Sequence, residues 1–147
     1  MEPPVFRAYL PADAPACFRL FDDNCPEFFA DNERADLVEF LRVPPAGYQV
    51  VLAGDQIVGA FGVLREEGRL ALRWIMLARD AQGRGLGRLI MAQAVAMVRA
   101  EGGRTLHIAT SHMSERFFAK FGAVETGRTP DGWGPGMHRV DLVLPVD

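Results

Sequence analysis

The chain has 147 residues, 49% of them hydrophobic, which is enough to expect a single globular domain over residues 1–147 with its own core. Its 16 Lys and Arg residues are outnumbered by 19 Asp and Glu residues, which gives a formal net charge of −3. Such a chain lacks the overall basic field that holds a polyanion by counterion release, so nucleic acid is not expected as its main partner.

Cysteine usage and the first residues bear on location. Cys17 and Cys25 have neither C-x-x-C spacing nor neighbouring histidines, so we expect reduced thiols and neither a disulfide framework nor a metal site. The opening segment MEPPVFRAYL lacks the basic and apolar blocks of a signal peptide. No apolar run approaches the roughly 18 residues of a membrane span. We therefore expect a cytoplasmic protein that does not associate with membranes.

The first third of the chain predicts a short strand and two helices, over residues 5–10, 13–23 and 31–43. Asp13 is the expected N-cap of the first helix, and Asp31 or Asn32 that of the second. Acidic residues in the first turn of the second helix suit its dipole. Residues 48–77 then read as three strands joined by tight turns at Gly54 and Gly68, an antiparallel meander.

The second half alternates helices with strands. The expected elements are a helix over 88–103, a buried strand over 105–109, a helix over 114–122 and a last strand over 138–146. The first of these helices is apolar on nearly all sides, so it must lie against a sheet. Together the elements predict a mixed α/β architecture.

The segment ARDAQGRGLGRLI places Gly83, Gly85 and Gly87 at alternate positions between a predicted strand and a predicted helix. Glycines let the backbone take positive φ angles and approach a ligand closely, so that successive N–H groups converge on an anion. The helix N-terminus adds free amides and partial positive charge, and Arg84 and Arg88 can add more. The segment predicts a phosphate or pyrophosphate site.

Three other interpretations of these glycines fit less well. A Rossmann fingerprint requires glycine where Arg88 stands, and no acidic ribose partner is evident on a second strand. A Walker A loop requires Gly-Lys-Ser/Thr, which the sequence lacks. A turn that only tightens strand-to-helix packing leaves the flanking arginines unexplained.

The run Gln82-Gly83-Arg84-Gly85-Leu86-Gly87 resembles the Gln/Arg-x-x-Gly-x-Gly/Ala signature of the GNAT superfamily, the acetyl-coenzyme A dependent N-acetyltransferases. IMLARDAQGRGLG is similar to the fourth strand and pyrophosphate loop of that family, and SERFFAKFGAVETG to its fourth helix and the strand that follows. The order of elements agrees. The resemblance implies a mostly antiparallel mixed sheet with a splayed central parallel pair, flanked by about four helices.

The resemblance also implies a site for acetyl-coenzyme A. In this family the loop amides bind the pyrophosphate, and a bulge in the preceding strand splays two parallel strands apart to admit the pantetheine arm. The thioester carbonyl then faces a backbone amide, an oxyanion-type arrangement. The cofactor-binding residues implied here are Met76, Leu77, Ala78, Gln82, Gly83, Arg84, Gly85, Leu86, Gly87, Arg88 and Ser111.

The sequence departs from the family pattern at its acid and base positions. Phe118 stands where many members have the Tyr that protonates the departing thiolate, and Ser111 stands where an Asn usually contacts the coenzyme. The fourth-strand face that often carries a Glu has no acid here. Glu66 and Glu67 are expected to be solvated in the preceding turn.

The catalytic candidates that remain are His112 and Ser114, between a predicted strand and helix near the expected thioester position. Ser114 is also an ordinary helix N-cap. His107 is interpreted as a core histidine, with a proton relay as the alternative. Arg73 either pairs within the sheet or orients an anionic substrate.

Aromatic residues suggest where an acceptor would bind. Phe28, Phe29 and Phe40 can wall an acceptor pocket, although Phe40 is expected in the core and adjacent Phe28 and Phe29 cannot both face inward on one helix. The Gly- and Pro-rich segment 130–139 presents an exposed-looking Trp133, which suits a loop over the acceptor site or a homodimer contact.

The sequence thus predicts an enzyme that transfers an acetyl group from acetyl-coenzyme A to a primary amine of a small molecule or peptide by direct attack. The alternative is a coenzyme-binding or regulatory module of the same fold that has lost its chemistry, which the phenylalanine at position 118 favours.

Overall fold

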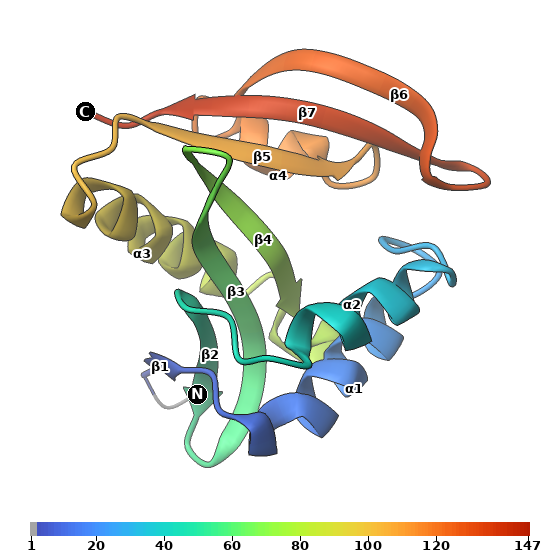
Figure 1. Ribbon diagram of the computed structural model, residues 1–147. Helices are drawn as coiled ribbons and strands as arrows, with labels where there is room; N and C mark the ends of the chain where they lie inside the picture. Colours follow the sequence, from blue (N-terminus) through green and yellow to red (C-terminus); the bar gives the residue numbers. More distant parts are fainter. Residues whose placement is uncertain (1–2) are drawn as a thin grey trace.

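The computed structural model describes residues 3–147 (Figure 1). Met1 and Glu2 lie outside the described residues. They begin the segment MEPPVFRAYL, which is not expected to be a signal peptide. One seven-stranded sheet runs through the molecule in the order β1-β2-β3-β4-β5-β7-β6. Its strands are β1 (Val5–Ala8), β2 (Tyr48–Ala53), β3 (Gln56–Glu66), β4 (Arg69–Leu77), β5 (Thr105–Ser111), β6 (Val124–Gly134) and β7 (Met137–Pro145).

Four α-helices flank this sheet: α1 (Ala14–Asn24), α2 (Glu33–Leu41), α3 (Leu86–Ala100) and α4 (Glu115–Ala119). Single 3-10 turns at Pro11–Asp13 and Arg79–Ala81 precede α1 and the glycine-rich loop. Every strand pair is antiparallel except β4 with β5. The predicted fold class, a mixed sheet with one central parallel pair and about four helices, is confirmed.

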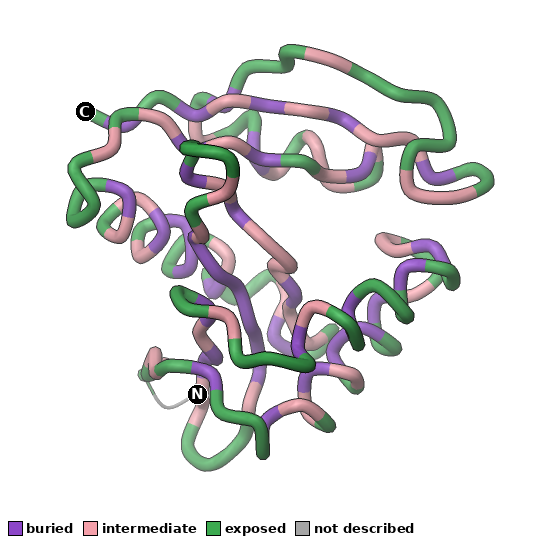
Figure 2. Tube along the Cα trace, viewed as in Figure 1, coloured by how far each residue is buried: buried purple, intermediate pink, exposed green. Residues whose placement is uncertain are grey.

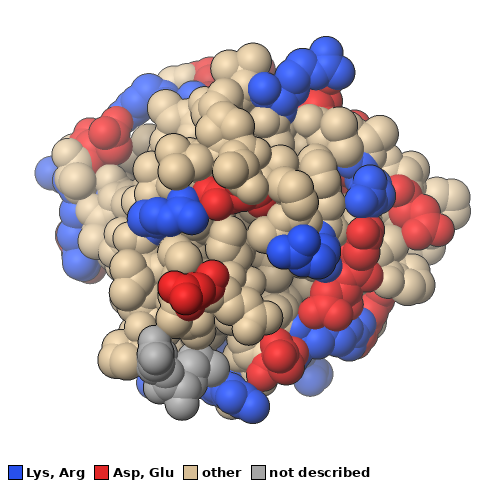
Figure 3. Space-filling model, turned by 90° about the horizontal axis from the view of Figure 1, so that it is seen from below, with Lys and Arg blue, Asp and Glu red and all other residues tan. Residues whose placement is uncertain are grey.

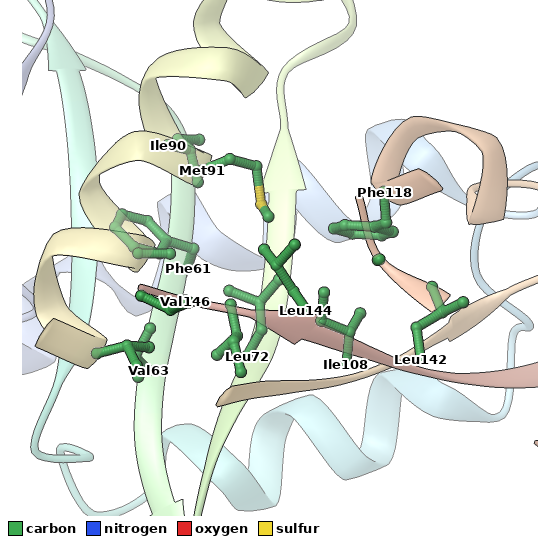
Figure 4. Close-up of a cluster of buried hydrophobic side chains, with 14 of the residues drawn as sticks. Phe61, Val63, Leu72, Ile90, Met91, Ile108, Phe118, Leu142, Leu144 and Val146 are labelled. Atoms are coloured by element: carbon green, nitrogen blue, oxygen red, sulfur yellow. The ribbon is translucent and has the colours of Figure 1, made fainter. Parts of the chain in front are cut away.

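The core forms two apolar clusters. α3 presents a stripe at helical spacing, from Leu86 and Ile90 to Val98, and packs with residues of β3, β4, β5 and β7 (Figure 4). α1 and α2 bury Phe21 and Leu37 in a second cluster with residues of β2. Figure 2 shows the buried positions along the central strands and on one side of α3, whose other side is exposed. The helix is thus amphipathic rather than apolar all round.

The parallel pair separates soon after it forms. β4 and β5 are in register only at Ala71 with His107 and Leu72 with Ile108. Beyond these pairs β4 contains a bulge, because Trp74 and Ile75 together lie opposite the single residue Phe61 of β3. In Figure 1, β5 and its neighbours β6 and β7 turn away from β1–β4. The expected splaying is present, and it opens the middle of the sheet.

Several local expectations are corrected. Asp13 precedes α1, but its carboxylate accepts hydrogen bonds from Leu10 N at 2.8 Å and from Arg7, so it closes the preceding turn instead of capping the helix. Asn32 is the N-cap residue of α2 by position, yet its Nδ2 donates to Trp133 O at 2.8 Å. Residues 130–134 belong to β6 rather than to a separate loop, and residues 130–133 bulge out of the ladder between the pairs that Thr129 and Gly134 form with β7.

The surface is mixed in charge. On the face shown in Figure 3, Lys and Arg side chains are interspersed with Asp and Glu, and neither sign covers it. Over residues 3–147, no helix is long and apolar enough to cross a membrane.

Candidate active site

A cleft of about 1630 Å³ occupies the gap between β4 and β5. Its lining comes from most of β4 and the turn before it, the glycine-rich loop, β5, α4, the segment between α1 and α2, and the β6–β7 hairpin. One end therefore contains the predicted phosphate loop, and aromatic side chains contribute to the rest of the wall. A cleft that joins these two kinds of surface can hold two substrates together.

Glycine is required at the three loop positions for two different structural reasons. Gly83 and Gly85 have φ angles of +78° and +82°, a conformation that residues with a side chain rarely adopt. Gly87 lies in the first turn of α3, where an added Cβ would come within 2.8 Å of the Phe117 ring. The sequence interpretation of backbone freedom thus holds for two glycines, whereas the third makes room for α4.

Free amides and one arginine face the cleft at this loop. The N–H of Leu89 is the first in α3 to bond within the helix, to Gly85 O at 3.2 Å, so the amides of Leu86, Gly87 and Arg88 have no intrahelical acceptor. Gly83, Gly85, Gly87 and Arg88 line the cleft. Arg84 is exposed on the loop and is not one of the lining residues.

The last residues of β4 present their backbone alternately to β3 and to the cleft. Ala78 N donates to Val58 O at 2.9 Å, and Met76 pairs with Ala60 two residues earlier. In an antiparallel ladder the residue between two such pairs turns its N–H and C=O the other way. Leu77 therefore directs both groups away from β3, toward the side on which β5 has separated.

Two side-chain amides fix this end of β4. Asn24, the last residue of α1, donates from Nδ2 to Leu77 O at 2.8 Å, and Gln82 donates from Nε2 to the same oxygen at 3.2 Å. The two amides also bond to each other, from Gln82 Nε2 to Asn24 Oδ1 at 2.9 Å. Leu77 O is thus occupied, and its N–H is the group left for a ligand. Sequence reasoning missed Asn24, which lies just past the predicted end of its helix.

The hydroxyl of Ser111 is buried at the cleft and is free to bond to a ligand. The residue is 6% exposed at the end of β5, lines the cleft, and its Oγ has no hydrogen-bond partner within residues 3–147. A buried hydroxyl without a partner costs stability until a ligand or water supplies one. This orphaned group, the free amides and the positive-φ glycines fit a coenzyme with phosphate and amide groups.

The two predicted proton donors both precede α4, but only Ser114 lines the cleft. Ser114, the N-cap residue by position, lines the cleft, and so does Phe118 behind it. His112 is not a lining residue, because its Nδ1 accepts a hydrogen bond from His138 N at 3.2 Å and its ring lies 4.7 Å from that of His138. The backbone of β7 thus holds the His112 side chain.

His107 and Arg73 both line the cleft. His107 is half-buried rather than in the core, because only alternate residues of β5 are buried. Arg73 forms an ion pair with Glu66, and its guanidinium lies 4.9 Å from the centre of the Phe40 ring. Glu66, expected to be solvated, is half-buried at the end of β3 and lines the same wall.

The aromatic wall differs from expectation in its members. Phe28 and Phe29 follow α1 in a turn, not on a helix, so both reach the cleft, whereas Phe40 does not line it. Trp133 is half-buried and donates from Nε1 to Thr110 O at 2.9 Å. Arg139 covers its ring at 5.0 Å.

Glu33 is the functional candidate that the sequence did not identify. It is the first residue of α2, and the sequence indicates only that an acid there suits the helix dipole. In the structure it is 5% exposed and lines the cleft. Burial raises its pKa to about 7, although a hydrogen bond from Ala30 N opposes this. The sign of it in the sequence is an acidic residue at the start of a helix, four residues after two adjacent phenylalanines.

Comparison with known proteins agrees with this geometry. A family model described as the Acetyltransferase (GNAT) family matches residues 14–123. A solved GNAT-family protein from Desulfovibrio desulfuricans is 28% identical, with a TM-score of 0.78 over 99% of this chain and 100% of that one. Among curated proteins none matches.

Two more distant structures share the fold. Ard1 from Thermoplasma volcanium is 16% identical, with a TM-score of 0.82 over 98% of each chain. YncA from Salmonella typhimurium, solved with its cofactor acetyl-CoA, is also 16% identical, with a TM-score of 0.72 over 99% of this chain and 95% of that one.

A splayed parallel pair beside a glycine-rich loop that opens a helix is the arrangement expected of proteins that bind acyl-coenzyme A. The chain belongs to the GNAT acetyltransferase family, as the match over residues 14–123 shows. The coenzyme of this family is acetyl-coenzyme A, which supplies the acetyl group and leaves as a thiol.

Proposed function

We propose that this protein is an N-acetyltransferase, acting as a single domain over residues 1–147, that acetylates a primary amine of a small molecule or peptide by direct attack on the thioester. The observation that carries the proposal is the Leu77 N–H, which faces the gap between β4 and β5. A preorganised amide aimed at an acyl oxygen stabilises the negative charge that develops as an amine adds to the carbonyl.

The glycine-rich loop is proposed to bind the pyrophosphate. Gln82, Gly83, Gly85, Leu86 and Gly87 would act through backbone amides or backbone shape, and the dipole of α3 adds favourable charge. Arg88 would add a charged contact from the lining, and Arg84 a weaker one from the rim because it is exposed.

The pantetheine arm is proposed to extend along β4 and β5. Met76, Leu77 and Ala78 would flank it on one side, with Leu77 as the residue whose N–H is free. Ser111 would contact it from the other, because its hydroxyl lacks a partner in residues 3–147.

The proton balance needs two acceptors. A primary ammonium loses one proton to bulk water before it attacks, and the adduct loses a second as the C–N bond forms and the C–S bond breaks. The second proton passes to the departing sulfur through Ser114 or water, because Phe118 cannot donate one. His112 remains a weaker candidate, since its Nδ1 is engaged by β7.

The competing function is a coenzyme-binding or regulatory module of the same fold, which the Phe118 side chain favours. Free-thiol release from acetyl-coenzyme A in the presence of a panel of primary amines distinguishes the two. Steady turnover supports the transferase. Tight coenzyme binding by calorimetry, without turnover on any amine, supports the binding module.

Location and assembly remain predictions. The two free thiols, Cys17 and Cys25, suit the reducing cytoplasm. The sequence also predicts that Trp133, on the β6–β7 hairpin, could lie at a homodimer contact.

A further inference from the structure

The Glu33 carboxylate is buried in the cleft without a cation. Its Oε2 accepts a hydrogen bond of 2.8 Å from Ala30 N, which satisfies one oxygen. Within the described part of the chain, no Lys, Arg or His lies within ion-pair distance of it. An ionised carboxylate this deeply buried is costly unless a positive charge joins it.

Two of the arginines that line the cleft are already paired with carboxylates. Arg73 on β4 pairs with Glu66 on β3, and on β7 Arg139 Nε lies 3.0 Å from Asp141 Oδ1. On its own helix Glu33 faces Asp36, whose charge raises the pKa of Glu33 further. Glu67 also lines the cleft without an ion pair, but it is exposed, so among the described residues Glu33 is the buried lining carboxylate that has no cation beside it.

Aromatic rings line the cleft together with Glu33, and one of them belongs to Trp74 in the bulge of β4. Phe29, four residues before Glu33, stacks on Phe21 at 5.1 Å and lies 5.8 Å from the Trp74 ring. On the other side of the cleft Trp133 is fixed by Asn32, which precedes Glu33 and donates to Trp133 O. The Glu33 carboxylate and these rings all line the cleft, and Leu77 lies three residues beyond Trp74 on β4.

We propose that Glu33 binds the ammonium of the acceptor, and that the acceptor is a primary amine carried on an aromatic or branched apolar group. This inference rests on the proposed transferase function and specifies its second substrate. An ammonium supplies the missing positive charge, and the apolar group packs on Phe29, Trp74 and Trp133. Peptide termini with polar side chains and polycationic amines fit this lining poorly.

The test uses 2-phenylethylamine and its neutral analogue 2-phenylethanol, with the protein saturated with coenzyme A to prevent turnover. Binding at pH 8 is measured by calorimetry and by tryptophan fluorescence, since Trp74 and Trp133, the two tryptophans of the chain, both line the cleft. We expect wild type to bind the amine at least tenfold more tightly than the alcohol.

Glu33→Gln keeps an oxygen for Ala30 N and removes the charge, so it should lose that preference while coenzyme A still binds as in wild type. Glu39→Gln is the matched control, because Glu39 lies on the same helix, is exposed and pairs only with Arg42. It should behave as wild type in both assays.

Equal amine affinity in wild type and a folded Glu33→Gln variant would overturn the inference. If that variant does not fold, wild type alone decides. The amine preference over the alcohol should then disappear between pH 8 and pH 5.5, and a preference that persists at pH 5.5 overturns the inference. A wild type that does not bind coenzyme A contradicts the proposed function instead, so the two failures are distinct.

Discussion

The hydroxyl of Tyr48 on β2 donates a hydrogen bond of 2.7 Å to the carbonyl oxygen of Trp74, the bulged residue of β4. Trp74 has a φ angle of +46°, a strained conformation for a residue with a large side chain. Tyr48 is fully buried, and burial raises the pKa of its hydroxyl well above the usual value, so the donor stays protonated. A buried tyrosine two strands away thus holds the bulge that opens the cleft.

Removing this hydroxyl should weaken both the fold and the site. Tyr48→Phe leaves a buried carbonyl oxygen without its donor, so we expect a loss of about 1–3 kcal/mol in the free energy of unfolding. Coenzyme A affinity should fall as well, because the bulge sets the direction of Leu77 N–H. Denaturant unfolding and calorimetry measure the two effects.

Tyr9→Phe is the control for that variant. Tyr9 is also buried, but its hydroxyl has no hydrogen-bond partner in the described chain, so its removal should be neutral or stabilising. Equal effects of the two substitutions would show that the bulge does not depend on Tyr48.

A side chain at Gly85 should abolish coenzyme binding. Gly85→Val places branched carbons on a residue whose φ is +82°, and it obstructs the amides that face the phosphate. Gly102→Val is the control, since Gly102 has a φ of +74°, equally open surroundings and a place at the far end of α3. Both variants should lose similar stability. Retained coenzyme affinity in Gly85→Val would exclude the loop as the phosphate site.

Ser111→Ala should separate binding from stability. Without ligand, the melting temperature should stay constant or rise, because the variant removes a buried hydroxyl that lacks a partner in residues 3–147. Coenzyme A should bind more weakly by roughly 3- to 10-fold, the range for one neutral hydrogen bond. A variant that melts lower and binds normally would mean that Ser111 is structural.

Glu33 should make stability depend on pH. The folded state holds the Glu33 proton to about pH 7, whereas the unfolded chain releases it near pH 4.5. In this window the unfolded state binds fewer protons, so the Glu33 contribution to stability is fully present below pH 4.5 and is lost as pH rises to about 7, by at most about 3 kcal/mol. Glu33→Gln should remove that component. Identical pH dependence in the two proteins, by urea unfolding from pH 4.5 to 8, would contradict the assignment.

Restoring a tyrosine on α4 should change turnover little. A thiolate is a tolerable leaving group, so Phe118→Tyr should alter kcat/KM by less than roughly tenfold on an amine that wild type acetylates. Turnover that appears only in the Phe118→Tyr variant would favour the binding module.

The elements and the conformation of the glycine-rich loop were predictable because they depend on local chemistry. Residues adjacent in the sequence are enough to indicate the alternating glycines before a helix and the tight turn at Gly68. The acceptor end was not predictable in the same way. Glu33, Asn24 and Trp133 acquire their surroundings from β4, β5 and β7, far away in the chain. His112 shows the reverse, since its position beside the predicted site says nothing of the His138 backbone that holds it.

The early separation of β4 from β5 also governs how this sheet meets other chains. Unpaired strand edges recruit foreign strands, and proteins protect them with short strands, charges and proline. The outer edges here follow that rule, since β1 has four residues and β6 carries Glu125, Arg128 and Pro130. The edges beside Leu77 instead line the cleft, where a slender ligand can pair with their backbone groups. The molecule thus carries an open sheet edge in its interior as well as the two protected edges at its rim.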